Sequence, residues 1–116
     1  MVLVVCTTSR KTGALQIIGQ PALVCKVTDT TVSAAAVISV KNTGLEPVII
    51  TAVYILGGNF TNTTVNVQIN PGESSGLSIP LNIATGVTAC PTIYTVDGVV
   101  VTTAGTYSTS FTVIKR

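Results

Sequence analysis

Residues 37–55 have the sequence VISVKNTGLEPVIITAVYI, and this stretch decides the fold. Two apolar runs rich in β-branched residues flank the segment KNTGLE, residues 41–46. β-Branched side chains favour the pleated surface of a strand. Asn42 and Gly44 suit a tight connection, and Pro47 begins the next run, where a missing N–H is tolerated. The stretch therefore predicts two strands joined by a turn.

The second of these runs, residues 47–55, is unusual for a strand of an antiparallel sheet. One face of such a sheet usually contacts water, so apolar and polar residues alternate. Here both alternating rows are mostly apolar. This predicts burial on both faces, by a missing segment of the chain or by an adjacent subunit. We therefore expect a subunit contact through Ile49, Val53 and Ile55, and we expect Val53→Lys or Ile55→Lys to leave a folded monomer that no longer associates.

The rest of the chain alternates with a period of two, which is typical of strands. The pair Asp97-Gly98 predicts a type I′ hairpin turn, and Pro80 predicts an edge strand. The predicted class is all-β, an immunoglobulin-like antiparallel β-sandwich of about seven to nine strands. We expect a single domain over residues 1–116, with residues 1–12 as a flexible or truncated N-terminal segment. The expected strand regions are 14–19, 21–27, 31–40, 47–55, 64–69, 76–83, 93–103 and 106–114.

Charge is scarce in this sequence. Charged residues make up 9% of the chain, against roughly 25% in an average soluble domain. The mean hydropathy is +0.66, yet no apolar stretch approaches the ~18 residues that a membrane-spanning helix needs. Thr, Ser and Asn replace the missing charges, so the sheet faces can meet without burying unpaired charges. This composition fits either a neutral extracellular domain or the subunit of a polymer.

Few residues of this chain suit catalysis or cofactor binding. It has no His, so it lacks the usual base at neutral pH. No nucleophile elbow and no glycine-rich phosphate loop is present. A net charge of +2 without Trp or a basic run argues against nucleic-acid binding. We expect no enzyme activity, no catalytic or cofactor-binding residues, no metal and no cofactor. Turn signals surround the four acidic residues, Asp29, Glu46, Glu73 and Asp97.

The three cysteines, Cys6, Cys25 and Cys90, permit two interpretations. Either one disulfide forms and one thiol is left over, as in a secreted protein, or all three are small buried hydrophobic residues. If a disulfide exists, we favour Cys25–Cys90, because Cys25 lies on the inward side of a strand and Cys90 lies beside a proline in a distant connection.

Two adjacent N-x-[ST] sequons lie in one loop. They are Asn59-Phe60-Thr61 and Asn62-Thr63-Thr64. The tripeptide is common by chance in a Thr-rich chain, but two copies in one Gly-flanked loop favour a glycosylated surface. Asn59 and Asn62 are therefore candidate glycosylation sites.

The segments VISVKNTGLEPVIITAVYILGG (37–58) and INPGESSGLSIPL (69–81) resemble the globular domain of archaeal type IV pilins and archaellin-like filament proteins. The resemblance spans residues 13–83. It implies a structural subunit, located outside the cell at the cell surface, of a filament used for adhesion or motility. It also implies copies of the chain as the partners, with surface glycans or host surfaces as further ones.

The sequence departs from that family at its beginning. Those pilins start with a long hydrophobic helix, which is absent here or reduced to MVLVVC, residues 1–6. A chain cut just after the helix is the favoured interpretation, and membrane contact would arise only through the absent helix. The alternative is a strand that completes a neighbour's sheet. The second functional hypothesis is an immunoglobulin-like binding or accessory module of a secreted or cell-surface protein.

Overall fold

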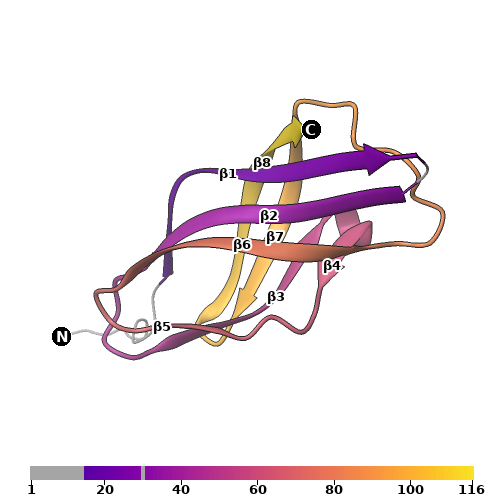
Figure 1. Ribbon diagram of the computed structural model, residues 1–116. Coiled ribbons are helices and arrows are strands. Elements are labelled where there is room, and N and C mark those ends of the chain that lie inside the picture. The colour runs from indigo at the N-terminus through magenta and orange to yellow at the C-terminus, as the bar shows by residue number, and fades with distance from the viewer. Residues whose placement is uncertain (1–14, 30) are drawn as a thin grey trace.

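The computed structural model describes residues 15–29 and 31–116, which form eight strands and one short 3₁₀ turn (Figure 1). Residues 1–12, for which the sequence analysis predicts a flexible or truncated segment, lie outside the described residues. The described residues contain no α-helix, and among them no helix is long and apolar enough to cross a membrane. The elements are β1 (Leu15–Thr28), β2 (Thr31–Asn42), β3 (Val48–Ile55), η1 (Leu56–Gly58), β4 (Phe60–Asn62), β5 (Val67–Ile69), β6 (Ser74–Ile83), β7 (Thr95–Thr102) and β8 (Gly105–Lys115).

The sheet closes on itself at β3. One edge of β3 pairs with β7, and the other pairs first with β5 and then with β4, which also pairs with β6. In the described part of the chain, seven strands form a closed ring in the order β3-β4-β6-β2-β1-β8-β7, and β5 lies beside β3. The all-β prediction is confirmed, but the architecture is a barrel and not a sandwich of two separate sheets.

The pairing of neighbouring strands is antiparallel at every described contact except one. β1 runs parallel to β8, with Cys25 opposite Lys115. Figure 1 shows β1, β2 and β6 side by side in front, with β8, β7 and β3 behind them. The core between these two walls contains both phenylalanines, Phe60 and Phe111, with β-branched and leucine side chains around them. The five residues that alternate along β2, Val32, Ala34, Ala36, Ile38 and Val40, all face this core, as their spacing predicts.

An extra residue in β3 explains why both of its rows are apolar. Ile50 pairs with Thr102 and Ala52 with Val101, so Thr51 has no opposite residue and forms a β-bulge. A bulge shifts the alternation by one position, so the row that faces inward changes at this point. Val48 and Ile50 face the core before the bulge, and Val53 and Ile55 face it afterwards. The hydroxyl of Thr51 donates to the carbonyl oxygen of Val101 at 3.2 Å, which fixes the bulged residue.

The proposed subunit contact through Ile49, Val53 and Ile55 is therefore wrong. Val53 and Ile55 are completely buried in the barrel itself, and Ile49 is half-buried. No second surface is needed to cover this strand. Val53→Lys or Ile55→Lys would place an ammonium group in the core, so each variant is expected to unfold the domain and not to release a monomer.

Two predicted breaks in the chain do not occur where the sequence analysis placed them. Segments 14–19 and 21–27 merge into the single strand β1, with a bulge between Ile18 and Ala22 where Gly19 has φ +69°. The pair Asp97-Gly98 lies in the middle of β7, and the β7–β8 turn follows at residues 103–104. Gly98 is buried because it lies under the Phe111 ring, where a side chain would collide. Its role is close packing and not a turn.

Asn42 joins the β2–β3 turn, the end of β5 and the β5–β6 turn at one end of the barrel. Its side chain is completely buried, and its amide nitrogen donates to the carbonyl oxygens of Glu46 at 2.7 Å and Ile69 at 2.9 Å. Its side-chain oxygen accepts from the backbone N–H of Gly44 at 2.9 Å. Its backbone N–H and carbonyl pair with Glu73 and Gly72. A buried amide is tolerated when its polar atoms are bonded in this way.

We expect Gly98→Ala to destabilise the protein by about 1–3 kcal/mol, because the new methyl group would displace the ring of Phe111 or the side chain of Ile55. Urea denaturation measures the change in the free energy of unfolding. Gly76→Ala is the matched control, since its nearest neighbouring atom, the Ser39 hydroxyl oxygen, would lie 3.9 Å away. Equal stabilities for the two variants would contradict the packing role of Gly98.

Candidate functional site

A disulfide joins β1 to the long connection between β6 and β7. Cys25 of β1 and Cys90 of the connection, residues 84–94, are bonded across 65 residues of sequence, with their Cα atoms 5.9 Å apart. This is the pairing that the sequence analysis favours. Cys25 is completely buried and Cys90 is half-buried. Cys6 lies outside the described residues. The disulfide therefore anchors a segment without regular secondary structure to the wall of the barrel.

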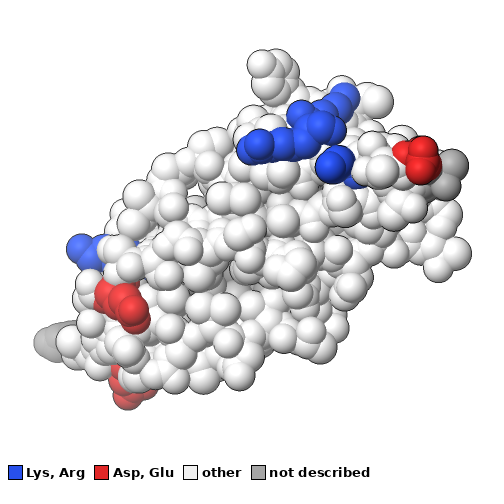
Figure 2. Space-filling model, viewed as in Figure 1, with Lys and Arg blue, Asp and Glu red and all other residues white. Residues whose placement is uncertain are grey.

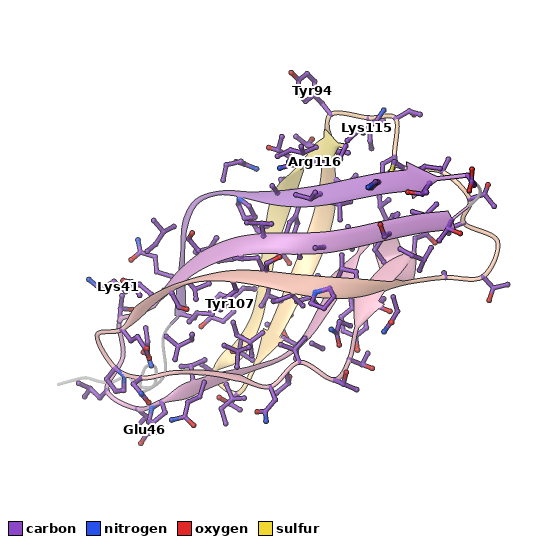
Figure 3. All side chains as sticks on the ribbon, viewed as in Figure 1. Lys41, Glu46, Tyr94, Tyr107, Lys115 and Arg116 are labelled. Atoms are coloured by element: carbon purple, nitrogen blue, oxygen red, sulfur yellow. A yellow bond between two sulfur atoms is a disulfide. The ribbon has the colours of Figure 1, made fainter. Side chains whose placement is uncertain are left out.

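Three cationic residues lie around Cys25. Lys26 follows it in β1, Lys115 is opposite it in β8, and the backbone N–H of Arg116 donates to its carbonyl oxygen at 2.9 Å. All three are exposed, and within the described residues no carboxylate is paired with them. Lys41 is the remaining cation in that part of the chain. Figure 2 shows most of the visible basic atoms gathered on one edge, with a separate basic group at the far side, and Figure 3 places Lys115 and Arg116 together, far from Lys41.

Two apolar side chains project beside these cations. Ile93 is 57% exposed and Tyr94 is 84% exposed. The carbonyl oxygen of Tyr94 accepts the backbone N–H of Val113 at 2.9 Å, so the segment lies directly against the end of β8. A small hollow lined by Thr92, Ile93, Tyr94, Val113 and Lys115 lies between the segment and the strand. We call the surface formed by Lys26, Ile93, Tyr94, Lys115 and Arg116 the basic end.

The outer wall beside the basic end carries small side chains. Lys26 and Arg116 border a shallow groove, whose outward-facing lining includes Ser33 and Ala35 of β2 and Val24 of β1. Such short side chains leave the ammonium and guanidinium groups unobstructed. The arrangement can bind an anionic group, since two cationic side chains from neighbouring strands border the same hollow.

Acidic residues lie mostly away from the basic end. Glu46 lies at the opposite end with Lys41 (Figure 3). Glu73 accepts the backbone N–H of Asn70 at 2.8 Å in the β5–β6 turn. Asp29 is the acidic residue closest along the chain to Lys26 and lies in the β1–β2 turn. Glu46 and Glu73 therefore lie near Lys41 at the opposite end, and Asp29 is the acidic residue nearest to Lys26 along the chain.

A second groove crosses the outer face of β3, β7 and β8. Its lining includes Tyr54, Asp97, Ser108 and Ser110. The hydroxyl of Ser110 lies 3.5 Å from a carboxylate oxygen of Asp97. The groove holds one carboxylate with a tyrosine and serines, and this set alone does not identify an acid–base pair. The prediction that the chain is not an enzyme stays a prediction.

The two sequon asparagines have different surroundings. Asn59 is exposed after η1. Asn62 is half-buried: its amide nitrogen donates to the carbonyl oxygen of Pro80 at 2.8 Å, and its side-chain oxygen accepts the hydroxyl of Thr64 at 3.0 Å. The folded chain therefore presents Asn59 more openly than Asn62. Glycosylation at either residue stays a prediction.

The described residues offer no soft ligands for a transition metal. Their sulfur atoms are those of Cys25 and Cys90, which are bonded to each other, and the chain has no His. Among the same residues, no group of three or more His, Cys, Asp or Glu side chains comes together in a way that could hold a metal ion. Copper in particular prefers thiolate, thioether and imidazole ligands.

The comparisons with known proteins give a fold and no family. No family model matches the chain, and no curated protein matches it. A solved structure that does match is the apo PCuAC domain from PmoF1. Its TM-score is 0.66 at 16% identity, and the match covers 91% of this chain and 98% of that one. At this identity the likeness establishes the shared fold alone.

The resemblance to archaeal type IV pilins is wrong. The described residues form a barrel similar to the PCuAC domain and contain no helix of the pilin type. A filament subunit for adhesion or motility, with copies of itself as partners, is therefore not supported. The comparison also gives no specific support to the immunoglobulin-like binding or accessory module. The Asn-Gly and Pro-Gly turns that carried the resemblance occur in unrelated β proteins, because they reflect backbone geometry.

Sequence reasoning did not identify the basic end. Its cations come from positions 26, 115 and 116, and they become neighbours only through the parallel pairing of β1 with β8. The one available signal was the sequence Pro91-Thr92-Ile93-Tyr94, where two large apolar residues follow a proline in a connecting segment. That pattern alone does not distinguish a projecting segment from the start of a strand.

Removing the disulfide should destabilise the domain. We expect Cys25→Ala/Cys90→Ala to lower the free energy of unfolding by about 4 kcal/mol, because the bond closes a loop of 65 residues of separation. Urea denaturation of both proteins measures the difference. Thr88→Ala, an exposed position in the same segment, is the control, with an expected change below about 0.5 kcal/mol. An unchanged midpoint for the double variant would contradict the anchoring role.

Proposed function

We propose that this chain is an exported, non-catalytic β-barrel domain that binds an anionic partner through its basic end. The observation that carries the proposal is the convergence of Lys26, Lys115 and Arg116 around one disulfide. Three unpaired cations on adjoining strands produce a local positive potential that a net charge of +2 would not reveal.

The disulfide supports the proposal of export. Structural disulfides persist in oxidising compartments and are rare in the cytosol. Cys25 is completely buried, which protects the bond from thiols in solution. The hydroxyl-rich, weakly charged surface agrees with an extracellular location at the cell surface, which we propose on these grounds.

The PCuAC neighbour raises the possibility of copper handling, but the residues that the structure describes do not fit that function. The shared barrel positions the backbone, but a copper site depends on soft side chains at the right places. In residues 15–29 and 31–116 the only cysteines form the disulfide. We therefore propose that this chain uses the same scaffold for a different task.

Binding of inorganic polyphosphate, a soluble polyanion, tests the proposal. We expect the full chain to bind it with an affinity that falls as salt rises, because exposed charges are screened. Lys115→Gln/Arg116→Gln should weaken binding by about 10-fold or more, since each lost cation–anion contact contributes on the order of 1 kcal/mol. Fluorescence anisotropy of labelled polyphosphate measures the dissociation constant.

The position of the charge, and not its total, is the decisive variable. Lys41→Gln removes a cation from the opposite end and should change the affinity by less than about twofold if the contact is confined to the basic end. If Lys41→Gln weakens binding as much per charge as the double variant, the anion is attracted by net charge alone and the proposed site is wrong.

A further inference from the structure

We infer that the anionic partner of the basic end is the surface of a lipid bilayer, to which the domain binds peripherally. The inference rests on the proposed anion binding and names its partner. It uses a feature that anion binding does not require, namely the two exposed apolar side chains beside the cations, Ile93 and Tyr94.

Tyr94 has the chemistry and the placement of an interfacial anchor. Tyrosine has an apolar ring with a polar tip, and this combination favours the boundary between headgroups and acyl chains. Its side chain is 84% exposed and projects from the basic end, and Figure 3 shows it beside Lys115 and Arg116. Ile93, next to it, is 57% exposed and adds an aliphatic group. Both side chains lie largely in water, and neither belongs to the core of the barrel.

The cations lie where headgroup phosphates would be when Tyr94 enters the interface. Lys115 borders the same small hollow as Ile93 and Tyr94, and Arg116 and Lys26 lie on the adjoining outer wall. Long basic side chains can extend toward phosphates while their methylene groups contact apolar surface. Each cation near an anionic membrane strengthens binding about fivefold.

The disulfide holds the two halves of this surface together. The connection 84–94 is bonded through its backbone at its two ends, where the Ala84 N–H donates to Asn59 and the Tyr94 carbonyl accepts from Val113. Between these points Cys90 is bonded to Cys25, which is the neighbour of Lys26. The apolar residues and the cations are therefore fixed relative to each other before binding, which lowers the entropy lost on binding.

A bilayer suits this surface better than an acidic protein does. Residues that dominate protein–protein contacts usually fill well-packed pockets on the partner. Tyr94 projects into solvent with 84% of its surface exposed, and a fluid interface accommodates such a group without a complementary pocket. With three cations and two apolar side chains, binding is expected to be weak and reversible, as for other proteins with few anchoring groups.

Vesicle sedimentation tests the inference. The full chain is mixed with vesicles of phosphatidylglycerol and phosphatidylcholine in equal parts, or of phosphatidylcholine alone, at about 50 mM salt. We expect the protein to partition into the anionic vesicles and to lose this partition at high salt. Binding to the neutral vesicles should be weaker than binding to the anionic vesicles by about 10-fold or more. Tyr94→Ser should weaken partition about 5-fold or more, while leaving polyphosphate binding within about twofold of the original.

The opposite end of the molecule supplies matched controls. Leu45 is 86% exposed near Lys41, so Leu45→Ser removes an equally exposed apolar side chain from the other end. It should leave vesicle binding unchanged. Thermal unfolding confirms that each variant is folded, and the exposure of the altered residues makes this the expected result.

Three outcomes would overturn the inference. Polyphosphate binding without vesicle binding would leave the anion site intact and point to an acidic macromolecule as its partner. If Tyr94→Ser and Leu45→Ser weaken vesicle binding to the same extent, any exposed apolar side chain promotes the association and the basic end has no special role. Equal partition into neutral and anionic vesicles would remove the role of the cations. Failure of both polyphosphate and vesicle binding would reject the proposed function itself.

Discussion

The extra residue at Thr51 of β3 determines which surfaces of this molecule are buried. Without the bulge, a regular strand would direct Val48, Ile50 and the other members of their row inward and leave Val53 and Ile55 to solvent. With it, both halves of β3 contribute to one core. The same strand pairs on both edges, with β7 on one side and with β5 and β4 on the other, so the bulged strand also closes the barrel. The bulge thus removes the need for a second molecule to cover the strand.

Alternation along the sequence was sufficient to predict the strands that lack irregularities. In β2 every second residue from Val32 to Val40 faces the core, and β6 buries Ile79 and Leu81 as its pattern indicates. These strands could be predicted because one face of the sheet is wet and the other is dry. The all-β class followed from the same signal repeated along the chain.

The features that could not be predicted depend on residues distant in sequence. A bulge changes which row of a strand faces inward but leaves the amino-acid composition of the strand unchanged. The two apolar rows of β3 therefore resemble a strand that is buried on both faces. Gly98 follows an aspartate as a turn glycine would, but it is required because Phe111 of β8 lies over it. The basic end could not be predicted either, because its cations become neighbours only through the parallel pairing of β1 and β8. Barrel closure through the three-residue strand β4 likewise has little local signal.

The scarcity of charge acquires a different meaning once the barrel is known. Most outward positions of the described strands β2, β6 and β8 carry Ser, Thr or small residues, which hydrate the sheet without producing a field. Within the described part of such a surface, few carboxylates lie near the cations and none is paired with them, so the potential near Lys115 and Arg116 extends over about a Debye length, roughly 10 Å at moderate salt. A more highly charged surface would compete with the basic end for anions and orient the domain less well. The weakly charged surface therefore does not imply contacts between copies of the chain. On such a surface the basic end is the main source of positive potential for an approaching anionic partner.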